Sequence, residues 1–180
     1  ASFPADPYCT NAEGHGPAWA NSLFEDFCEF GLGMKLGSDR VRETIAEIMT
    51  QGLDCDKASD EIKALFKQWL ENKNNPAITR EVADKLSPLM EATDCPHCKK
   101  LLSYKKFIPA RSQWIIGGDG ASYDIGYGGL DHVLASGENV NILVLDTEVY
   151  SNTGGQSSKA TPAGAIAKFA ASGKKIRKKD

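Results

Sequence analysis

Two apolar runs in the second half of the chain are each followed at once by glycine or polar residues. The first covers residues 114–116 and stops at Gly117, where Gly-Asp-Gly follows. The second covers residues 140–145 and ends at Asp146. Short continuous apolar runs bounded by turn residues are typical of buried strands. We therefore expect a strand at each of these two places.

The segment between the two runs predicts how the strands are connected. Residues 123–135 carry apolar side chains at roughly helical spacing. A strand, a glycine-rich turn, a helix and a strand form a βαβ unit, in which the strands are parallel and end at the same edge. Ligands of open α/β sheets bind at that edge. We expect Asp119 and Thr147, which follow the two runs, to be neighbours there.

The residue types at these strand ends suit a metal ion shared with a diphosphate. Asp119 can hold Mg2+, and further oxygens can come from Thr147 and from the backbone carbonyl of Val149. Glycines let phosphate oxygens reach backbone N–H groups, and the N-terminus of a helix favours their negative charge. Taken alone, Gly-Asp-Gly is equally compatible with a tight turn after a strand. The prediction of a metal–diphosphate site therefore depends on the two strand ends together.

The first hundred residues have the spacing of helices. We expect helices over residues 19–30, from about Ser38 to Gly52, and over residues 59–70 and 78–90. Glycine at position 31 should end the first helix, and Pro88 should interrupt the last. Residues 38–100 should thus form a helical segment whose role is packing or contact rather than catalysis. A further helix is expected directly before the basic run of residues 174–179.

Composition and charge narrow the class of protein. The 180 residues are 41% hydrophobic and 25% charged, an ordinary globular mixture with enough chain for one core. The net charge of −3 gives no sign of the basic surface that nucleic-acid-binding proteins have. No apolar run approaches the length that spans a bilayer, so we expect neither nucleic acid nor a membrane as a partner. Five cysteines without a secretory leader suit a reducing compartment, so the expected location is the cytoplasm, with an organelle such as the hydrogenosome as the alternative.

The motif that most clearly suggests a functional site other than the metal–diphosphate site is Cys95-Pro-His-Cys98. It resembles the dithiol of periplasmic thiol oxidases, but such a site follows a buried strand, and residues 90–94 are mostly polar. Zinc would need a second pair, whereas the other cysteines are scattered singly, at Cys9, Cys28 and Cys55. We expect a surface loop. A labile metal or disulfide site and a catalytic dithiol are the alternatives.

Longer motifs resemble a known family. Residues 117–175 begin GGDGASYDIGYGG, continue through DTEVYSNTGGQ, and are similar to the thiamine-diphosphate-binding domain of the pyruvate:ferredoxin (or flavodoxin) oxidoreductases. The upstream segments GHGPAWANSLFED, at residues 14–26, and EFGLGM, at residues 29–34, resemble the same family. Thiamine-diphosphate enzymes in general place Asn where this sequence has Thr147. The DTEVYSNTGGQ variant therefore points to the oxidoreductases rather than to decarboxylases or transketolases.

The resemblance implies a fold and a set of ligands. It implies the α/β thiamine-diphosphate-binding fold, with a mainly parallel sheet flanked by helices and a helical insertion. Residues 1–180 would be a partial thiamine-diphosphate-binding domain of a larger chain. Asp119, Thr147 and the Val149 carbonyl would hold Mg2+, and Gly118 and Gly120 would cradle the diphosphate.

Two further residues receive roles from the resemblance. Asn152 would face the reacting end of the cofactor and the substrate, as the catalytic residue of this segment. Phe24 would lie against the organic part of the cofactor. The glutamate that activates the cofactor is expected on another domain or subunit, so we expect no turnover by this chain alone.

The implied activity is oxidative decarboxylation of pyruvate, or of another 2-oxoacid, to CO2 and acetyl-coenzyme A. Electrons would pass through iron–sulfur clusters, whose ligands lie outside this sequence, to ferredoxin or flavodoxin. The full-length protein would be a homodimer. The alternatives are a non-redox thiamine-diphosphate lyase or decarboxylase, and a redox module built on Cys95 and Cys98.

Overall fold

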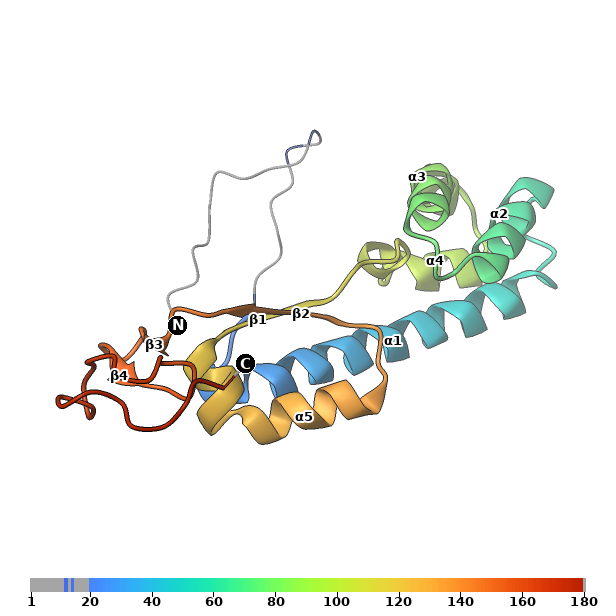
Figure 1. The fold of residues 1–180 in the computed structure, drawn as a ribbon. Coiled ribbons are helices and arrows are strands. Elements are labelled where there is room, and N and C mark those ends of the chain that lie inside the picture. Colours follow the sequence, from blue (N-terminus) through green and yellow to red (C-terminus); the bar gives the residue numbers. More distant parts are fainter. Residues whose placement is uncertain (1–11, 13, 15–19, 180) are drawn as a thin grey trace. The chain divides into compact units, whose positions relative to one another are not determined.

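A computed structural model describes residues 12, 14 and 20–179 of the chain (Figure 1). The described residues divide into two compact units, one formed by those up to residue 33 together with residues 113–179 and the other by residues 34–112. Cys9 lies outside the described residues, and so does residue 19, the first of the helix predicted over residues 19–30. The predicted start of that helix is wrong, because residues 20–23 are not helical and the helical structure begins with the 3-10 turn η1 (Phe24–Asp26). Among the described residues, no helix combines the length and the apolar character that crossing a bilayer requires.

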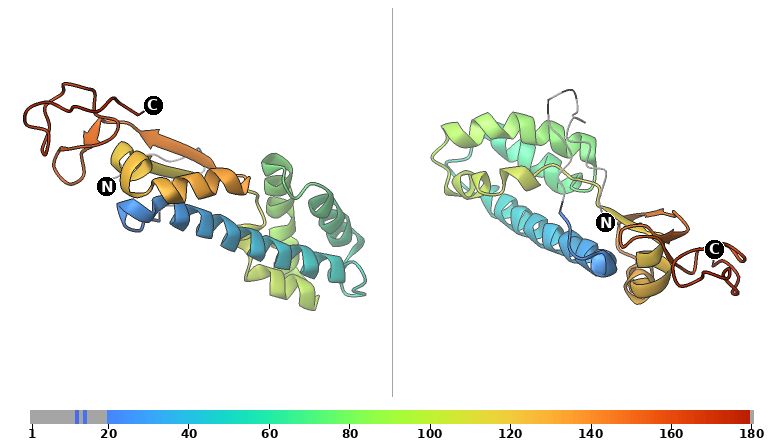
Figure 2. Two further views of the ribbon diagram at one scale, coloured as in Figure 1. Left: turned by 60° about the horizontal axis from the view of Figure 1, so that its bottom comes forward. Right: turned by 90° about the vertical axis from the view of Figure 1, so that its left-hand side faces the viewer.

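Helices make up the unit of residues 34–112. They are the larger part of α1 (Phe27–Gly52), α2 (Asp60–Glu71), α3 (Pro76–Ala92), α4 (Pro96–Leu102) and the 3-10 turn η2 (Lys105–Phe107). Figure 2 shows α2, α3 and α4 gathered beside the C-terminal part of α1. Their apolar faces share one buried core, whose largest members are Trp69, Phe66, Ile45, Ile48, Met49, Leu86 and Met90.

Two of the predicted helices are confirmed, and their ends follow from capping. The Ser59 hydroxyl accepts a hydrogen bond from the backbone N–H of Ile62 and so begins α2. Asn75 caps α3 in the same way. The expected interruption at Pro88 is wrong, because α3 continues to Ala92. A proline removes one helical hydrogen bond, but the buried side chains around it, including Met90, keep that stretch packed as helix.

The expected break at Gly31 is also wrong. Helix α1 runs without interruption from Phe27 to Gly52. A β-carbon at Gly31 would lie 2.5 Å from Cγ1 of Ile115. Glycine is therefore present at this position because a neighbouring strand comes close, and not because the helix ends there.

The other unit is built around the predicted βαβ arrangement. Strand β1 (Trp114–Gly118) pairs in parallel with β2 (Asn141–Leu145), with Trp114 opposite Asn141 and Gly118 opposite Leu145. Between them lie the π-helical turn η3 (Gly120–Ile125) and helix α5 (Tyr127–Ser136). A short antiparallel hairpin, β3 (Val149–Tyr150) and β4 (Gln156–Ser157), follows β2. The α/β class and the parallel pair are thus confirmed.

Helices cover one face of the β1–β2 pair. Ile115 packs with Phe27 and Cys28 from the start of α1 and with Leu130 and Val133 from α5. Figure 1 shows both helices on the same side of the strands. Side chains alternate along a strand, so the opposite face carries Trp114, Leu143 and Leu145, which are 55%, 41% and 42% exposed. We call these three residues the open sheet face.

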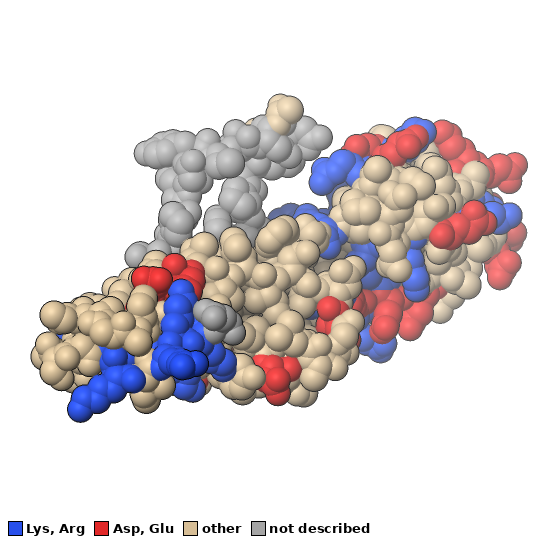
Figure 3. All heavy atoms as spheres, in the orientation of Figure 1, with Lys and Arg blue, Asp and Glu red and all other residues tan. Residues whose placement is uncertain are grey.

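The end of the chain contains no helix among residues 158–179, so the helix expected before the basic run is wrong. The segment folds back on itself through turns. The Lys174 ammonium donates to the carbonyl oxygens of Lys159 and Thr161, at 2.7 and 2.6 Å. Lys178 pairs with Asp146 and Glu148, each at 3.2 Å. Figure 3 shows basic side chains gathered on one part of the surface, while charges of both signs mix over the helical unit.

Candidate metal and diphosphate site

The ends of β1 and β2 bring Asp119 and Thr147 together. Oδ1 of Asp119 accepts hydrogen bonds from the backbone N–H and from the hydroxyl of Thr147, at 3.2 and 3.1 Å. The two residues are 28 positions apart in the sequence, and the parallel pairing of the strands is what makes them neighbours. The juxtaposition expected from the apolar runs is therefore present.

The third predicted ligand belongs to the same group. The Thr147 hydroxyl lies 3.1 Å from the carbonyl oxygen of Val149 and 2.6 Å from the hydroxyl of Ser151. Glu148, between Thr147 and Val149, has a φ of 65°, which is uncommon for a residue with a side chain. This left-handed turn lets the residues on either side of it direct oxygens toward one place. The oxygens of Asp119, Thr147 and Val149 thus form one connected set, called the oxygen group below, whose role in metal binding stays a prediction.

Ser158 completes the surroundings of Asp119, and sequence reasoning missed it. Asp119 is fully buried, and the hydroxyl of Ser158 donates to its Oδ2. Ser158 is itself buried and accepts a hydrogen bond from the backbone N–H of Ala160 at 3.2 Å. It follows Asp119 by 39 residues and lies three residues after Gly155, in a polar stretch where no apolar run marks a strand end in the sequence.

The two glycines beside Asp119 differ in their surroundings. A β-carbon at Gly118 would meet nothing within 4 Å, whereas one at Gly120 would lie 2.4 Å from the ring of Tyr150. The Tyr150 ring in turn meets the ring of Phe24 edge-on, with centroids 6.3 Å apart. Phe24 therefore lies in the same unit as the oxygen group and is joined to Gly120 through Tyr150, a residue that the sequence did not indicate.

The Tyr150 phenol keeps its proton at physiological pH. Burial raises its pKa, and the charges of Asp124 and Asp119 add to this, outweighing a hydrogen bond from the backbone of Ile125. The side chain is therefore a neutral aromatic wall beside Gly120.

Asn152 lies in the turn between β3 and β4 and is exposed. It directly follows Ser151, whose hydroxyl contacts Thr147. Within the described part of the chain, no hydrogen bond ties the Asn152 side chain to the oxygen group. Asn152 is thus adjacent in the sequence to a residue that contacts the oxygen group. Its catalytic role stays a prediction.

The Cys95-Pro-His-Cys98 motif is not a surface loop, so that expectation is wrong. Cys95 and Cys98 are both fully buried, at the N-terminus of α4. The short helix buries Cys98 and Leu101 on one side, and its seven residues are too few for that spacing to stand out in the sequence. Cys55 is not isolated either, because its Sγ lies 3.5 Å from that of Cys95.

The buried thiols of this motif differ in acidity. Burial raises the pKa of the Cys95 thiol, but hydrogen bonds involving Cys98, Cys55 and the His97 backbone outweigh it, and the pKa lies below its ordinary value. For Cys98, burial and the neighbouring thiols raise the pKa to about 12.

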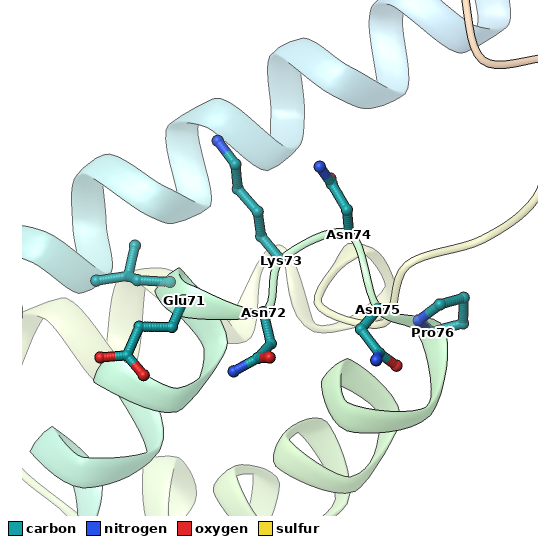
Figure 4. A pocket seen from close by; sticks show the side chains of 7 residues that line it. Glu71, Asn72, Lys73, Asn74, Asn75 and Pro76 are labelled. Carbon is teal, nitrogen blue, oxygen red and sulfur yellow. The ribbon is translucent and has the colours of Figure 1, made fainter.

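A hollow of about 500 Å³ lies at the loop between α2 and α3, lined by residues 70–76. The labelled side chains in Figure 4 point in different directions rather than toward a common point. Asn75 is engaged in capping α3, and the Lys73 carbonyl accepts a hydrogen bond from Arg42. None of the predicted site residues lines this hollow, and it offers no converging set of ligands.

Cys28 packs with Ile115 of β1, and its thiol allows the effect of burial on the pH dependence of stability to be measured. Burial and the charge of Glu29 raise the pKa of its thiol to about 12. The folded state therefore keeps a proton that the unfolded state releases from its ordinary pKa of 9.0. The resulting stabilisation is complete below pH 9.0 and is lost as the pH rises to about 12. Between about pH 8 and about pH 11, wild type should lose roughly 2 kcal/mol more unfolding free energy than Cys28→Ala.

Denaturant unfolding of both proteins at the two pH values measures this difference. Equal losses in wild type and Cys28→Ala would show that the Cys28 thiol ionises in the folded protein as readily as in the unfolded chain.

No protein-family model matches the chain. Whole-chain similarity to curated proteins is nevertheless high. The chain is 60% identical over its whole length to the pyruvate-flavodoxin oxidoreductase of Klebsiella pneumoniae, of which it covers 16%. It is 52% identical, over 99% of its length, to the pyruvate:ferredoxin oxidoreductase of Moorella thermoacetica, again covering 16%. Over 97% of its length it is 46% identical to the mitochondrial pyruvate dehydrogenase [NADP(+)] of Euglena gracilis, of which it covers 10%.

These relatives are oxidoreductases that share pyruvate in their names, and the chain spans about a sixth or less of their length. The similarity runs through the oxygen group at the ends of β1 and β2, because it covers nearly every residue of the chain. The resemblance found in the sequence motifs is thereby confirmed. Over its whole length, the chain is a homologue of one segment of the pyruvate-flavodoxin and pyruvate:ferredoxin oxidoreductases.

Proposed function

We propose that this chain is the segment of a pyruvate oxidoreductase that binds thiamine diphosphate through Mg2+. The observation that carries the proposal is the set of oxygens from Asp119, Thr147 and Val149, joined by contacts of 3.1 Å at the C-terminal edge of a parallel βαβ unit. Mg2+ favours carboxylate, hydroxyl and carbonyl oxygens and commonly shares its coordination with phosphate groups. The donor set therefore fits the ion.

The hydrogen bonds around these oxygens support separate roles for the proposed ligands and for the two serines that orient them. Ser158 donates to Oδ2 of Asp119, which leaves Oδ1 as the oxygen that faces Thr147. With a cation in place, the Thr147 hydroxyl would give its one proton to Ser151, 2.6 Å away, instead of to Asp119, and so present a lone pair to the cation. Ser158 and Ser151 would thus hold two ligands in the orientation that a metal ion needs.

The diphosphate would lie against the backbone at Gly118 and Gly120. The position of Gly118 is open on the side where a β-carbon would stand, so phosphate oxygens can approach the chain there. Phe24 would lie against the organic part of the cofactor, and Asn152 would orient the substrate at its reacting end. When bound, thiamine diphosphate supplies the carbon nucleophile and the electron sink for loss of CO2 from a 2-oxoacid.

The names of the relatives support pyruvate as the substrate. They name flavodoxin, ferredoxin or NADP+ as the second reactant, yet all three proteins match this same segment. The segment should therefore serve the step that they share, which is the reaction of pyruvate, and not the choice of acceptor. Iron–sulfur clusters, coenzyme A and a dimeric full-length protein remain part of the proposal for the whole enzyme.

The two alternatives have less support. A non-redox lyase would need no electron acceptor, whereas these relatives are named as oxidoreductases or dehydrogenases. A dithiol module would place its chemistry at Cys95 and Cys98, both of which are fully buried.

Titration of the chain with thiamine diphosphate tests the proposal, with calorimetry as the readout and circular dichroism as the check on folding. Saturable binding is expected with Mg2+ and should disappear in EDTA. Thiamine without its diphosphate is the matched control and should bind far more weakly. A folded chain that binds both compounds equally, or neither, would contradict the proposal.

A further inference from the structure

We propose that Cys55, Cys95 and His97 form a Zn2+ site in the unit of residues 34–112, with Cys98 beside them as a further thiol. This site is separate from the oxygen group proposed for Mg2+ and does not depend on the thiamine diphosphate proposal. Its residues come from two parts of the chain, the turn after α1 and the N-terminus of α4.

The spacing of the ligand atoms fits a tetrahedral ion. One ligand atom from each of Cys55, Cys95 and His97 lies within 4.8 Å of the other two. The two sulfurs are 3.5 Å apart. Two thiolates on a tetrahedral Zn2+, each with a bond of about 2.3 Å, are separated by ~3.8 Å, so Cys55 and Cys95 need to move only slightly.

The imidazole of His97 gives an independent reason to expect a ligand. Its Nδ1 is buried and has no hydrogen-bond partner, and it is the one side-chain atom in the described part of the chain with this property. Buried polar atoms are rarely left without a partner, because the loss of their hydration is costly. A metal ion would satisfy this nitrogen or draw the ring around to coordinate through its other one.

Cys98 can complete the coordination. It lies outside the set of three within 4.8 Å, but it follows Cys95 by three residues at the N-terminus of α4 and is equally buried. A change of rotamer would have to bring its sulfur to the ion. Cys55, Cys95, His97 and Cys98 would then supply three sulfurs and one nitrogen, one of the common ligand sets of structural zinc sites.

The donor types favour Zn2+ over the other metals considered for this protein. Mg2+ takes oxygen ligands, and iron–sulfur clusters are normally held by four thiolates, whereas this group has three sulfurs and an imidazole. A zinc ion here would tie the turn after α1 to α4 and so hold the helical unit together. Binding would release the thiol protons, so the affinity should fall at acidic pH.

The test is the metal content of the intact chain purified without chelator, followed by exchange with Co2+. We expect about one Zn2+ per chain. With Co2+ we expect the visible absorption of a tetrahedral thiolate complex. Cys55→Ala and Cys95→Ala should lose the metal. His97→Ala should weaken binding by at least the roughly 10–100-fold that loss of a second-shell partner costs.

Cys28→Ala is the matched control, because Cys28 is an equally buried cysteine in the other unit and should leave the metal content unchanged. A folded wild-type chain that takes up neither Zn2+ nor Co2+ would overturn the proposal. So would a Cys55–Cys95 disulfide found by mass spectrometry of protein purified under reducing conditions. The absorption spectrum of the wild-type chain with Co2+ decides whether a tetrahedral thiolate site is present, even if the alanine variants fail to fold.

Discussion

Asp119→Asn should abolish Mg2+-dependent binding of thiamine diphosphate while leaving the chain folded. The carboxylate is the one charged group among the proposed ligands, since Thr147 and Val149 offer a hydroxyl and a carbonyl. Its loss should cost more than the roughly 10–100-fold that follows the removal of an outer-shell partner. Calorimetric titration with Mg2+ and thiamine diphosphate measures the change.

The fold should survive this substitution because asparagine preserves most of the contacts. Its amide oxygen can still accept from Thr147, and its NH2 group can donate to the Ser158 hydroxyl, which is free to rotate. We expect a loss of about 1–3 kcal/mol in unfolding free energy, from weaker hydrogen bonds to a group that has lost its charge.

Asp146→Asn is the matched control. Asp146 stands at the end of β2, pairs with Lys178 and accepts a hydrogen bond from the backbone N–H of Glu148, but it is not a proposed ligand. It should bind the cofactor with nearly wild-type affinity. If Asp146→Asn lost binding and Asp119→Asn kept it, the metal would have to lie elsewhere at this edge.

Gly120→Ala should both destabilise the chain and weaken cofactor binding. A β-carbon would stand 2.4 Å from the ring of Tyr150, so the ring must move away from Gly120, which disturbs its edge-on contact with Phe24. Overpacking of this kind costs about 1–3 kcal/mol. Denaturant unfolding measures the stability, and titration with thiamine diphosphate measures the binding.

Two further variants separate packing from ligand contact. Gly118→Ala adds a methyl group where nothing lies within 4 Å, so it should change the stability by less than about 0.5 kcal/mol and still weaken diphosphate binding. In a Tyr150→Ala background, Gly120→Ala should lose most of its cost in stability. Strictly additive effects of the two substitutions would mean that the Tyr150 ring is not the obstacle.

The strands and the pair formed by Asp119 and Thr147 could be predicted from the sequence because each depends on a short local pattern. An apolar run that stops at a turn residue marks a strand end, and the parallel rule then brings two such ends together. The α2 helix was predictable for the same reason, since Ser59 caps a regular apolar stripe.

The remaining features depend on contacts between distant residues, which no local pattern records. Gly31 resembles a helix end but is needed because Ile115 comes close to it. Ser158 reaches Asp119 only after the chain has passed through the β3–β4 hairpin. Cys55 and Cys95 are 40 residues apart, and packing of the helical core brings them together.

The open sheet face bears on how the chain behaves in concentrated solution. Parallel strands are normally covered on both sides, yet Trp114, Leu143 and Leu145 are exposed on a sheet to which the described residues contribute two strands. Exposed apolar strands with free edges promote sheet-to-sheet association between molecules. Self-association should therefore grow with concentration and compete with folding during expression, and a chaperone or a solubilising fusion partner should raise the yield of monomer.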